Sequence, residues 1–392
     1  MKTIDDLIGT AKASSDLQSR QARIRYTLSS SVSSGQYHRH TLSKYPDQFI
    51  DMRSLRLRFQ LEINSTDPNC CIDAPNVNTL FSRVRVLCGS SVIMDVINSH
   101  IYNAIDENIH GSVPTENKYD RYLRGHGTLA ERRVWAQNSR EYILSFQRNS
   151  VLNCSALLPL FKLSDLHIEI WNCTGPETLH SPLGDQSCSF TMSDMELHAN
   201  FISSKSISSY FATRQVQFHI NEVSHRFNNC TGQTSLLKFS SAHSSLNRII
   251  TLLRDAGGLS VEHGERSSRG ISSEALDNFQ LFINSVRFYD VNVDSTEQMF
   301  GHFKNAFPKL CYSEWFDDYA STKFLLVNNL MSAPSDFAES VLSGVKTSSI
   351  NSDTALQIQF KMTPTNVVAD SFLLCDGLIT LPSGRSELTL SY

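Results

Sequence analysis

The chain has 392 residues, 40% of them hydrophobic and 19% charged, with 35 basic and 39 acidic side chains for a formal net charge of −4. This apolar fraction can bury one large core or two ordinary ones, which excludes global disorder. The near-neutral charge argues against a protein that grips phosphates through a basic surface, so we expect no sequence-specific nucleic acid binding.

No stretch of the sequence has the length and apolarity of a membrane span, because the best candidate, residues 151–166, is interrupted by Asn153, Lys162 and Asp165. Asp5 and Asp6 stand where the apolar run of a secretory signal would begin. We therefore expect a protein made and kept inside a cell, with its nine cysteines as free thiols.

The first two dozen residues are expected to form a helical arm, since good helix formers continue through Ala22. One face of this helix carries an apolar stripe at helical spacing: Ile4, Leu7, Ile8 and Ala11. The Ser-rich run 29–35 would then act as a hinge. We expect the stripe to contact a neighbouring subunit, with a lipid surface and the arm's own domain as the second and third alternatives.

Strict alternation of apolar and polar residues over 55–63 predicts a half-buried strand. Further strands are expected at 83–87, 142–146, 166–171, 195–201, 215–221, 279–288, 324–330, 356–362 and 372–381. Helices are expected at 101–109, 244–254 and 295–307, the last two from their Ser or Asp caps and Gly or Pro stops.

The two halves of the chain resemble each other in order. The alternating segment 166–170 matches 356–360, and each is followed by a last alternating strand, at 195–201 and 373–381. These later strands are offset by roughly 180 to 190 residues, and the opening strands at 55 and 215 by about 160. The pattern favours two tandem copies of one β-sandwich with a boundary near residue 205, and one large β protein remains the alternative.

The search for catalytic chemistry finds little. His38 and His40 have the spacing of two metal ligands on a strand, but the carboxylate that a cupin-type oxygenase adds is absent, so we interpret them as solvated. The usual nucleotide-binding and hydrolase loops are missing. A basic cluster, interpreted as an ion-paired surface or a subunit contact, contains Arg121, Arg124, Arg132 and Arg133. We expect no enzyme, no cofactor and no metal site.

The segment from Pro75 to Ile93 carries an Asn-x-Leu-Phe-Ser-x-Val element formed by Asn78, Leu80, Phe81, Ser82 and Val84. It resembles a stretch of the double jelly-roll major capsid proteins of icosahedral double-stranded DNA viruses, the adenovirus-hexon-like lineage, and especially the small virophage, polinton and large-DNA-virus type. The resemblance continues through 281–288, 324–330 and 356–360, and it covers most of residues 50–392 in order.

This resemblance implies an all-β fold with short helices: two tandem eight-stranded antiparallel jelly rolls plus an N-terminal helical arm. The expected divisions are an arm and hinge over 1–40, a first jelly roll over 41–205 and a second over 206–392. A short outer loop is expected within 115–140, with candidate residues Tyr119, Tyr122, Arg124 and Trp135.

The function implied is that of a structural major capsid protein. Three chains would form a pseudo-hexameric capsomer, burying loop residues such as Phe300, Phe303 and Phe307, and capsomers would tile the icosahedral virion shell. Expected partners are the same chain, neighbouring capsomers, minor or penton capsid proteins, and an internal viral membrane reached by the arm. The protein would be synthesised and assembled inside the host cell.

A second function remains open, that of a carbohydrate- or receptor-binding β-sandwich such as a viral spike or a lectin-like module. It predicts an exposed cluster of Trp and Tyr with carboxylates, and the sequence places its three tryptophans, Trp135, Trp171 and Trp315, far apart. A cupin-type enzyme is a distant third.

Overall fold

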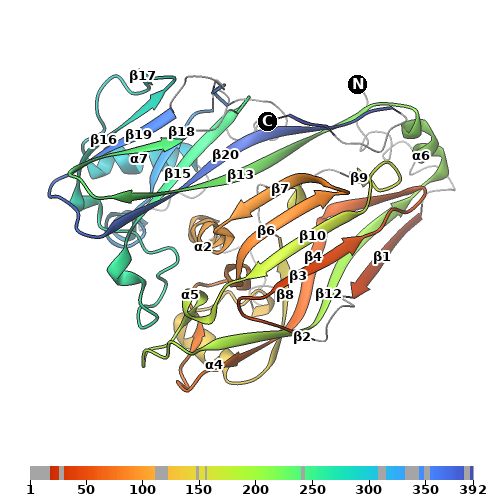
Figure 1. Cartoon of the computed structure of the whole chain (residues 1–392), viewed down its shortest axis with the longest axis horizontal. Helices are drawn as coiled ribbons and strands as arrows, with labels where there is room; N and C mark the ends of the chain where they lie inside the picture. Colours follow the sequence, from red (N-terminus) through yellow and green to blue (C-terminus); the bar gives the residue numbers. More distant parts are fainter. Residues whose placement is uncertain are drawn as a thin grey trace.

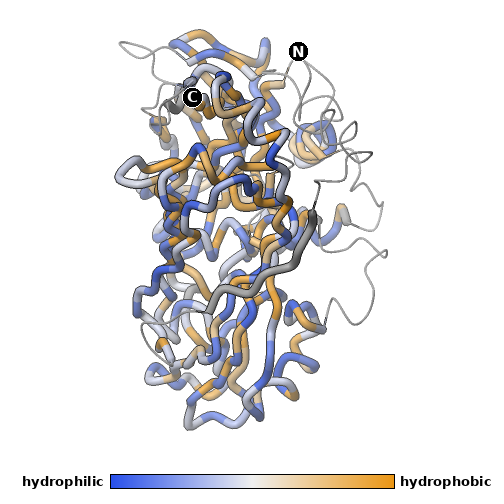
Figure 2. Tube along the Cα trace, turned by 90° about the vertical axis from the view of Figure 1, so that its right-hand side faces the viewer, coloured by the Kyte–Doolittle hydropathy of each residue, from blue (hydrophilic) through white to orange (hydrophobic). Residues whose placement is uncertain are grey.

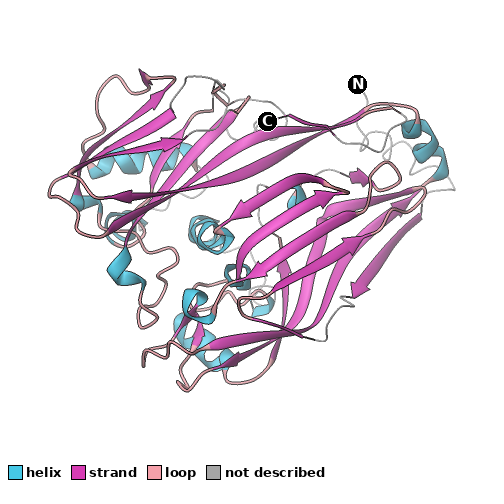
Figure 3. Ribbon diagram, viewed as in Figure 1, coloured by secondary structure: helices cyan, strands magenta, loops and turns pink. Residues whose placement is uncertain are grey.

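The computed structural model describes residues 18–25, 31–110, 122–146, 150–154, 157–239, 243–307, 315–331, 344–347, 354–383 and 389–391. These residues form two β-sandwiches, one from each half of the chain, with short helices in the connections between strands (Figures 1 and 3). The expected all-β fold with short helices is confirmed.

The first sandwich, here called the first roll, is built from residues 18–203. One sheet has the order β1 (Gln18–Arg25), β12 (Ser189–Ser203), β4 (Gln48–Asn64) and β8 (Arg140–Ser145), with β2 (Ser31–Ser33) paired to β12 and β9 (Leu157–Pro159) paired to β4. The facing sheet has the order β3 (Tyr37–Leu42), β10 (Leu166–Asn172), β6 (Phe81–Cys88) and β7 (Ser91–Ile97). A small ladder pairs β5 (Cys71–Ile72) with β11 (Leu179–His180).

The second sandwich, the second roll, is built from residues 216–391. One sheet has the order β13 (Val216–Cys230), β20 (Val367–Leu381), β15 (Leu246–Asp255) and β18 (Leu326–Asn329), with β21 (Thr389–Ser391) paired to β20. The facing sheet has the order β14 (Thr234–Phe239), β19 (Thr354–Phe360), β16 (Leu276–Ile283) and β17 (Val286–Arg287).

Helices and single helical turns occupy the connections. The α-helices are α2 (Ser99–His110), α4 (Leu129–Ala136), α5 (Gly175–Thr178), α6 (Lys205–Ala212), α7 (Thr296–Ala306) and α8 (Trp315–Ser321). The 3-10 turns are η1 (Val77–Leu80), η2 (Val151–Asn153), η3 (Ala256–Leu259) and η4 (Ser273–Ala275). Helix α6 lies between the last strand of the first roll and the first strand of the second.

The two rolls have the same strand order. Eight strands of the first roll, taken along the chain as β1, β3, β4, β6, β7, β8, β10 and β12, occupy the sheet positions that β13 to β20 occupy in the second. In both rolls the first, eighth, third and sixth strands make one sheet, and the second, seventh, fourth and fifth make the other. All these pairs are antiparallel. The prediction of two tandem eight-stranded antiparallel jelly rolls is therefore confirmed.

The predicted match of the strand at 55–63 with the strand at 215–221 was wrong. Strand β4, which contains the alternating segment 55–63, corresponds to β15 and not to the strand at 215–221. The first residues of β4 and β15, Gln48 and Leu246, are 198 residues apart, as are Gln18 and Val216 at the starts of β1 and β13. The error arose because both β1 and β15 were predicted as helices.

Strand β15 replaces the helix expected at 244–254. Ile249, Ile250, Leu252 and Leu253 are all buried, and so is Thr251 between them. A strand that is covered on both faces shows a continuous apolar run in place of alternation, so its periodicity does not distinguish it from a buried helix. The β-branched residues favour the strand that forms.

From Gln18 onward the predicted N-terminal helix is wrong, because residues Gln18–Arg25 form strand β1. Its backbone pairs antiparallel with β12, from Gln18 opposite Ser203 to Arg25 opposite Glu196. Pairing with an existing sheet outweighs the modest helix propensity of this segment. The segment 1–40 is thus not an arm throughout, because β1, β2 and most of β3 belong to the sheets of the first roll.

The strands place apolar side chains between the sheets of each roll. In β4 the inward residues Leu55, Leu57, Phe59 and Leu61 are buried, while the alternate residues are only partly buried or exposed. Figure 2 shows hydrophobic and hydrophilic residues interleaved along the chain throughout the molecule. Burial of such residues supplies most of the free energy that holds the two sheets together.

The histidines of β3 also point into this core, so their interpretation as solvated was wrong. His38 is 0% exposed and His40 is 2% exposed, and His38 Nδ1 lies 3.1 Å from His40 Nε2. Both share the inward side of β3 with Leu42. Burial lowers the pKa of His38 to about 4, and burial followed by the charge of His38 lowers the pKa of His40 to about 3.

The aromatic residues Phe300, Phe303 and Phe307 also differ from expectation. They lie on or directly after helix α7 and pack within the second roll, where Phe300 and Phe303 contact the ring of Tyr319 at centroid distances of 5.0 and 5.4 Å. Phe303 and Phe307 are buried within the single chain. Their burial does not require contact with another subunit.

We predict that the buried histidines make the first roll acid-sensitive. Because the folded pKa of His38 lies below its unfolded value of 6.5, its stabilising effect is complete above that value and is lost as pH falls toward 4. Urea unfolding should show a loss of about 2 to 3 kcal/mol from this residue between pH 7.5 and 4.5. His38→Leu should remove that part of the pH dependence.

The exposed His219 of β13 provides the control, since His219→Leu should leave the pH dependence unchanged. Equal pH dependence in the wild type and in His38→Leu would contradict the prediction.

Candidate functional site

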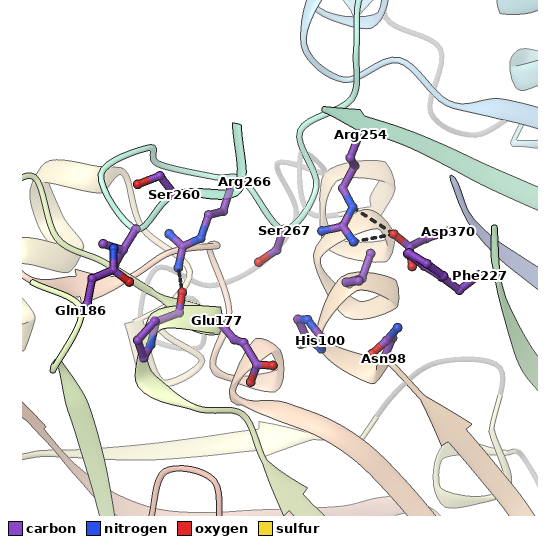
Figure 4. Close-up of a pocket in the computed structure, with 13 residues that line it drawn as sticks. Asn98, His100, Glu177, Gln186, Phe227, Arg254, Ser260, Arg266, Ser267 and Asp370 are labelled. Carbon is purple, nitrogen blue, oxygen red and sulfur yellow. Dashed lines mark hydrogen bonds and ion pairs between the residues drawn. The ribbon is translucent and has the colours of Figure 1, made fainter. Parts of the chain in front are cut away.

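The two rolls meet at a polar junction that holds a cavity of about 340 Å³ (Figure 4). The first roll contributes Asn98, His100 and the α5 residues Pro176 and Glu177, and the second roll contributes Phe227, Arg254, Ser260, Arg266 and Asp370. The cavity is therefore a feature of how the halves fit together, and neither roll alone contains it.

On the side of the second roll, a carboxylate is buried between two basic groups. Arg254 Nε and Nη2 donate to Asp370 Oδ2 at 3.0 and 2.5 Å, and His225 Nε2 donates to Asp370 Oδ1 at 2.8 Å. Burial by itself would raise the pKa of Asp370, but the hydrogen bond from His225 and the charge of Arg254 hold it below its usual value. The carboxylate is thus ionised and fully paired.

A second buried ion pair crosses from roll to roll. Arg266 Nη1 donates to Asp73 Oδ1 at 3.2 Å, and both the amide and the hydroxyl of Ser267 donate to Asp73 Oδ2 at 3.1 Å. The other arm of the guanidinium donates to the carbonyl oxygens of Pro176 and Leu179 at 2.5 and 2.6 Å. One side chain of the second roll therefore connects two separate segments of the first, one at Asp73 and one at 176–179.

Backbone contacts and an aromatic pair extend this junction. The amide of Ser181 donates to the carbonyl oxygen of Val261 at 2.9 Å. The ring of Tyr102, on α2, lies 5.3 Å from the ring of Phe372, on β20, between centroids. Hydrogen bonds, charge and apolar burial thus act together across the same boundary.

His100 lines the cavity from α2 and is buried. Burial lowers its pKa to about 4, so the imidazole is neutral near pH 7. Its Nδ1 atom has no hydrogen-bond partner among the described residues. The charges of Asp370 and Arg266 are each compensated by a buried ion pair, and the Glu177 carboxylate in the same lining accepts hydrogen bonds from the amide and hydroxyl of Thr174.

The motif residues Asn78, Leu80, Phe81, Ser82 and Val84 lie on η1 and the start of β6. Leu80, Phe81 and Val84 are buried in the first roll. Asn78 Nδ2 donates to the carbonyl oxygen of Ser145 at 3.0 Å, and Ser82 Oγ donates to that of Trp171 at 3.2 Å. In this structure the segment joins strands of the two facing sheets.

The proposed outer loop is only partly within the described residues, and Tyr119 lies outside them. Tyr122 is exposed, and its ring meets that of Trp135 edge-on at 5.3 Å. The guanidinium of Arg140 covers both rings, 3.3 and 4.4 Å from their centroids. Arg124 is partly buried, and its carbonyl oxygen accepts the amide of Val77.

The basic cluster expected on the surface contains at least one buried arginine. Arg132 is 3% exposed, and it donates to the carbonyl oxygens of Ile72, Gly127 and Asp73 at 3.0, 2.6 and 2.8 Å. The prediction of a surface position was therefore wrong for Arg132, although its Nη2 atom does form an ion pair with Glu265 Oε1 at 3.6 Å. Arginine can be buried in this way because its five donors satisfy several carbonyls at once.

The apolar stripe of the arm, formed by Ile4, Leu7, Ile8 and Ala11, lies outside the described residues. Across the described part of the chain, no helix is long and apolar enough to cross a membrane. The same residues include no group of three or more His, Cys, Asp or Glu side chains placed to hold a metal ion.

The sequence did not identify the junction. Asp73 and Arg266 are separated by almost half of the chain, and no local motif surrounds either of them. A weak signal existed in β20, where Asp370 and Asp376 interrupt an otherwise apolar run, because a charge in a buried strand needs a partner.

Searches of protein-family models and of curated proteins found no match to this sequence. Solved structures do match it along nearly its whole length. VP54 of the virus PBCV-1, whose crystal structure was fitted into a reconstruction of the virophage Sputnik, has a TM-score of 0.69 at 11% identity, covering 96% of this chain and 97% of that one.

Two further matches have the same extent. The structure of the Sputnik virophage contains a chain with a TM-score of 0.60 at 8% identity, covering 95% of this chain and 88% of that one. The Faustovirus major capsid protein has a TM-score of 0.59 at 8% identity, covering 96% and 94%.

We predict that removing one partner of the ion pair between the rolls destabilises the protein strongly. Arg266→Met leaves the Asp73 carboxylate buried without its counter-charge, so the free energy of unfolding should fall by about 3 kcal/mol or more. Lys323→Met, which breaks the exposed pair of Lys323 with Asp318, should cost less than about 1 kcal/mol. Small and equal losses in chemical denaturation of both variants would refute a special role for the junction pair.

A second prediction concerns Glu222 on β13, which faces Asp95 on β7 of the other roll. Burial, and then the charge of Asp95, raise the pKa of Glu222 to about 7, partly offset by Arg226. A raised folded pKa means that stability is complete below the unfolded value of 4.5 and is lost as pH rises through 7. Glu222→Gln should therefore gain about 2 kcal/mol relative to the wild type at pH 7.5, and little at pH 4.5.

The matched control is Glu262→Gln at an exposed position, which should show no such pH-dependent gain in thermal unfolding. The same gain at both pH values for Glu222→Gln would rule out titration as its cause.

The strand order, the whole-length matches and the confirmed tandem architecture agree, and the chain therefore has the double jelly-roll fold seen in the major capsid protein of Faustovirus.

Proposed function

We propose that this protein is a structural major capsid protein that trimerises into pseudo-hexameric capsomers and tiles an icosahedral virion shell. The observation that carries the proposal is the tandem repeat of one jelly-roll strand order along nearly the whole chain. The structure matched at a TM-score of 0.65 with similar coverage is described as part of the PBCV-1 virus capsid.

The geometry of the chain supports a building block. Two rolls of the same topology in one chain let three chains present six similar units around a three-fold axis, which suits hexagonal packing. For this purpose the rolls must hold a fixed relative position. The buried pair of Arg266 with Asp73 and the ring contact of Tyr102 with Phe372 support such a rigid connection.

The hairpin that follows β16 supports self-association. Val286 and Val291 are 68% and 70% exposed, and Phe288 is exposed beside them. They lie at β17 or directly after it, at the edge of its sheet, where backbone groups and apolar side chains are both open to a partner. We assign this surface, the Val286–Val291 hairpin, to contacts between copies of the chain.

The finer parts of the proposal rest on the sequence. We propose a division between the two rolls near residue 205. The stripe of Ile4, Leu7, Ile8 and Ala11 would contact neighbouring capsomers, minor or penton capsid proteins, or an internal membrane. The chain would be located in the virion and would have no catalytic role or cofactor.

The carbohydrate-binding alternative has less support. The rings of Trp135 and Trp171 lie on α4 and β10, in different parts of the first roll. Each is covered by arginine: Arg140 over Trp135, and Arg83 and Arg85 over Trp171. A sugar-stacking platform would need an open ring face.

We predict a trimer in solution. Size-exclusion chromatography with light scattering should give three times the monomer mass, and electron microscopy should show hexagonal particles. Val286→Asp combined with Val291→Asp should lower the trimer fraction at least tenfold at micromolar concentration, because two charges would be buried in the contact. Met362→Asp, at a position 82% exposed outside this hairpin, should leave the trimer intact.

A strict monomer at all concentrations would argue against the proposed function. A trimer that is unaffected by the double substitution would show that the contact between copies lies on another surface.

A further inference from the structure

The cavity between the two rolls has the size and the position of a ligand site. Its volume is about 340 Å³, and side chains of both rolls line it. Pockets that bind small molecules start at about 300 Å³ and are common where two domains meet. Water alone would need roughly eleven molecules to fill this space. The chemistry of the lining then decides which class of molecule the cavity can bind.

The positive charges of the lining are already compensated. Arg254 donates two hydrogen bonds to the buried carboxylate of Asp370, and Arg266 donates to that of Asp73. The other arm of the Arg266 guanidinium is bound to carbonyl oxygens of the first roll. An anion entering the cavity would therefore meet arginines whose charge a buried carboxylate already balances.

One negative charge of the lining has no cation beside it. Glu177, on α5, is exposed, and its Oε2 accepts hydrogen bonds from the amide and the hydroxyl of Thr174 at 2.7 and 2.8 Å. Both donors are neutral, and the described part of the chain contains no ion pair of Glu177. Two arginines thus stand against three carboxylates, those of Asp370, Asp73 and Glu177, which leaves an excess of one negative charge.

Hydrogen-bond acceptors lie near this carboxylate. His100 is 9% exposed, and its neutral imidazole has one acceptor nitrogen. Among the described lining residues, it is the one with a buried polar atom, Nδ1, that lacks a hydrogen-bond partner. The hydroxyl of Ser267 donates to Asp73 and keeps its lone pairs for a further donor. In Figure 4 the side chains of Glu177, His100 and Ser267 surround the same space.

An apolar wall completes the lining. Phe227, on β13, is 54% exposed and lies beside Asp370 in Figure 4. Ile101, Pro176 and Val261 add aliphatic surface. The face of an aromatic ring attracts an organic cation, and aliphatic side chains favour contact with an alkyl chain.

We propose that the cavity between the rolls binds a primary alkylammonium ion, the protonated form of an aliphatic amine. An ammonium group has three donors and no acceptor, so it suits a lining that offers a carboxylate and neutral acceptors. The ammonium donates to Glu177, with His100 and Ser267 as further acceptors, and its charge balances the excess negative charge. The alkyl chain lies against Phe227 and the aliphatic wall.

Such a ligand would contact both rolls at once. Glu177 and His100 belong to the first roll, and Phe227 and Ser267 belong to the second. A molecule that binds only when the two rolls are joined stabilises the folded chain by mass action. The melting temperature should therefore rise with the concentration of the amine.

The test uses the full-length protein at pH 7.5 and constant ionic strength, with three probes of equal chain length: n-hexylamine, 1-hexanol and hexanoate. Titration followed by NMR should show saturable binding of the amine with a dissociation constant on the order of 1 mM. The neutral alcohol should bind at least about tenfold more weakly, and hexanoate should not bind. The amine alone should raise the melting temperature.

Glu177→Gln should weaken binding of the amine about tenfold or more, because it removes the charge and keeps the capping box of α5, where Gln can replace Glu. The matched control is Glu131→Gln, at the same capping-box position of α4 but outside the cavity lining, which should bind the amine as the wild type does. Phe227→Leu should weaken binding about two- to fivefold.

Absence of saturable amine binding would show that the cavity holds water only and would overturn the proposal. Equal binding of the amine and the alcohol, tighter binding of hexanoate, or unchanged binding in Glu177→Gln would overturn it as well. The comparison of the three probes on the wild type decides the matter even if a variant fails to fold.

Discussion

The structure depends on one long strand, β20, which pairs with a strand on each edge and also contacts the first roll. It lies between β13 and β15 in its sheet, and most of its residues are buried. From this strand Phe372 reaches the ring of Tyr102 in the first roll, and Asp370 accepts hydrogen bonds from His225 and Arg254. A shift of β20 by one residue would exchange its two faces and break the core and the junction together.

This constraint explains why the junction is polar. The sheet that contains β20 is covered by its own roll on one face, and its other face must fit a second body of the same kind. Apolar packing alone would allow the two rolls to slide, whereas buried ion pairs have a defined geometry. Arg266, with its donors shared among Asp73, Pro176 and Leu179, fixes the position of the second roll on the first. We infer that these pairs specify the arrangement more than they add to stability, since burying charges costs much of what their attraction returns.

Strands with one face toward the core could be predicted from their alternation alone. In β4, Leu55, Leu57 and Phe59 alternate with polar residues, and this pattern alone located the strand. Strand β15 could not be recognised in this way, because Ile249 to Leu253 are buried on both faces and leave no alternation to detect. Strand β1 was missed for the opposite reason: its residues favour a helix in isolation, and only the edge of β12 makes the strand.

The same distinction separates the fold from the candidate site. Strand order is specified by many weak and repeated preferences, which explains how this chain can match VP54 with a TM-score of 0.69 at 11% identity. The junction depends on single residues whose partners are remote in the sequence, such as Asp73 and Arg266, and no period or spacing connects them. The two rolls can therefore share a topology while their residues differ, because each roll needs only an apolar interior. The contact between them has no such freedom, since every buried charge there needs one particular partner.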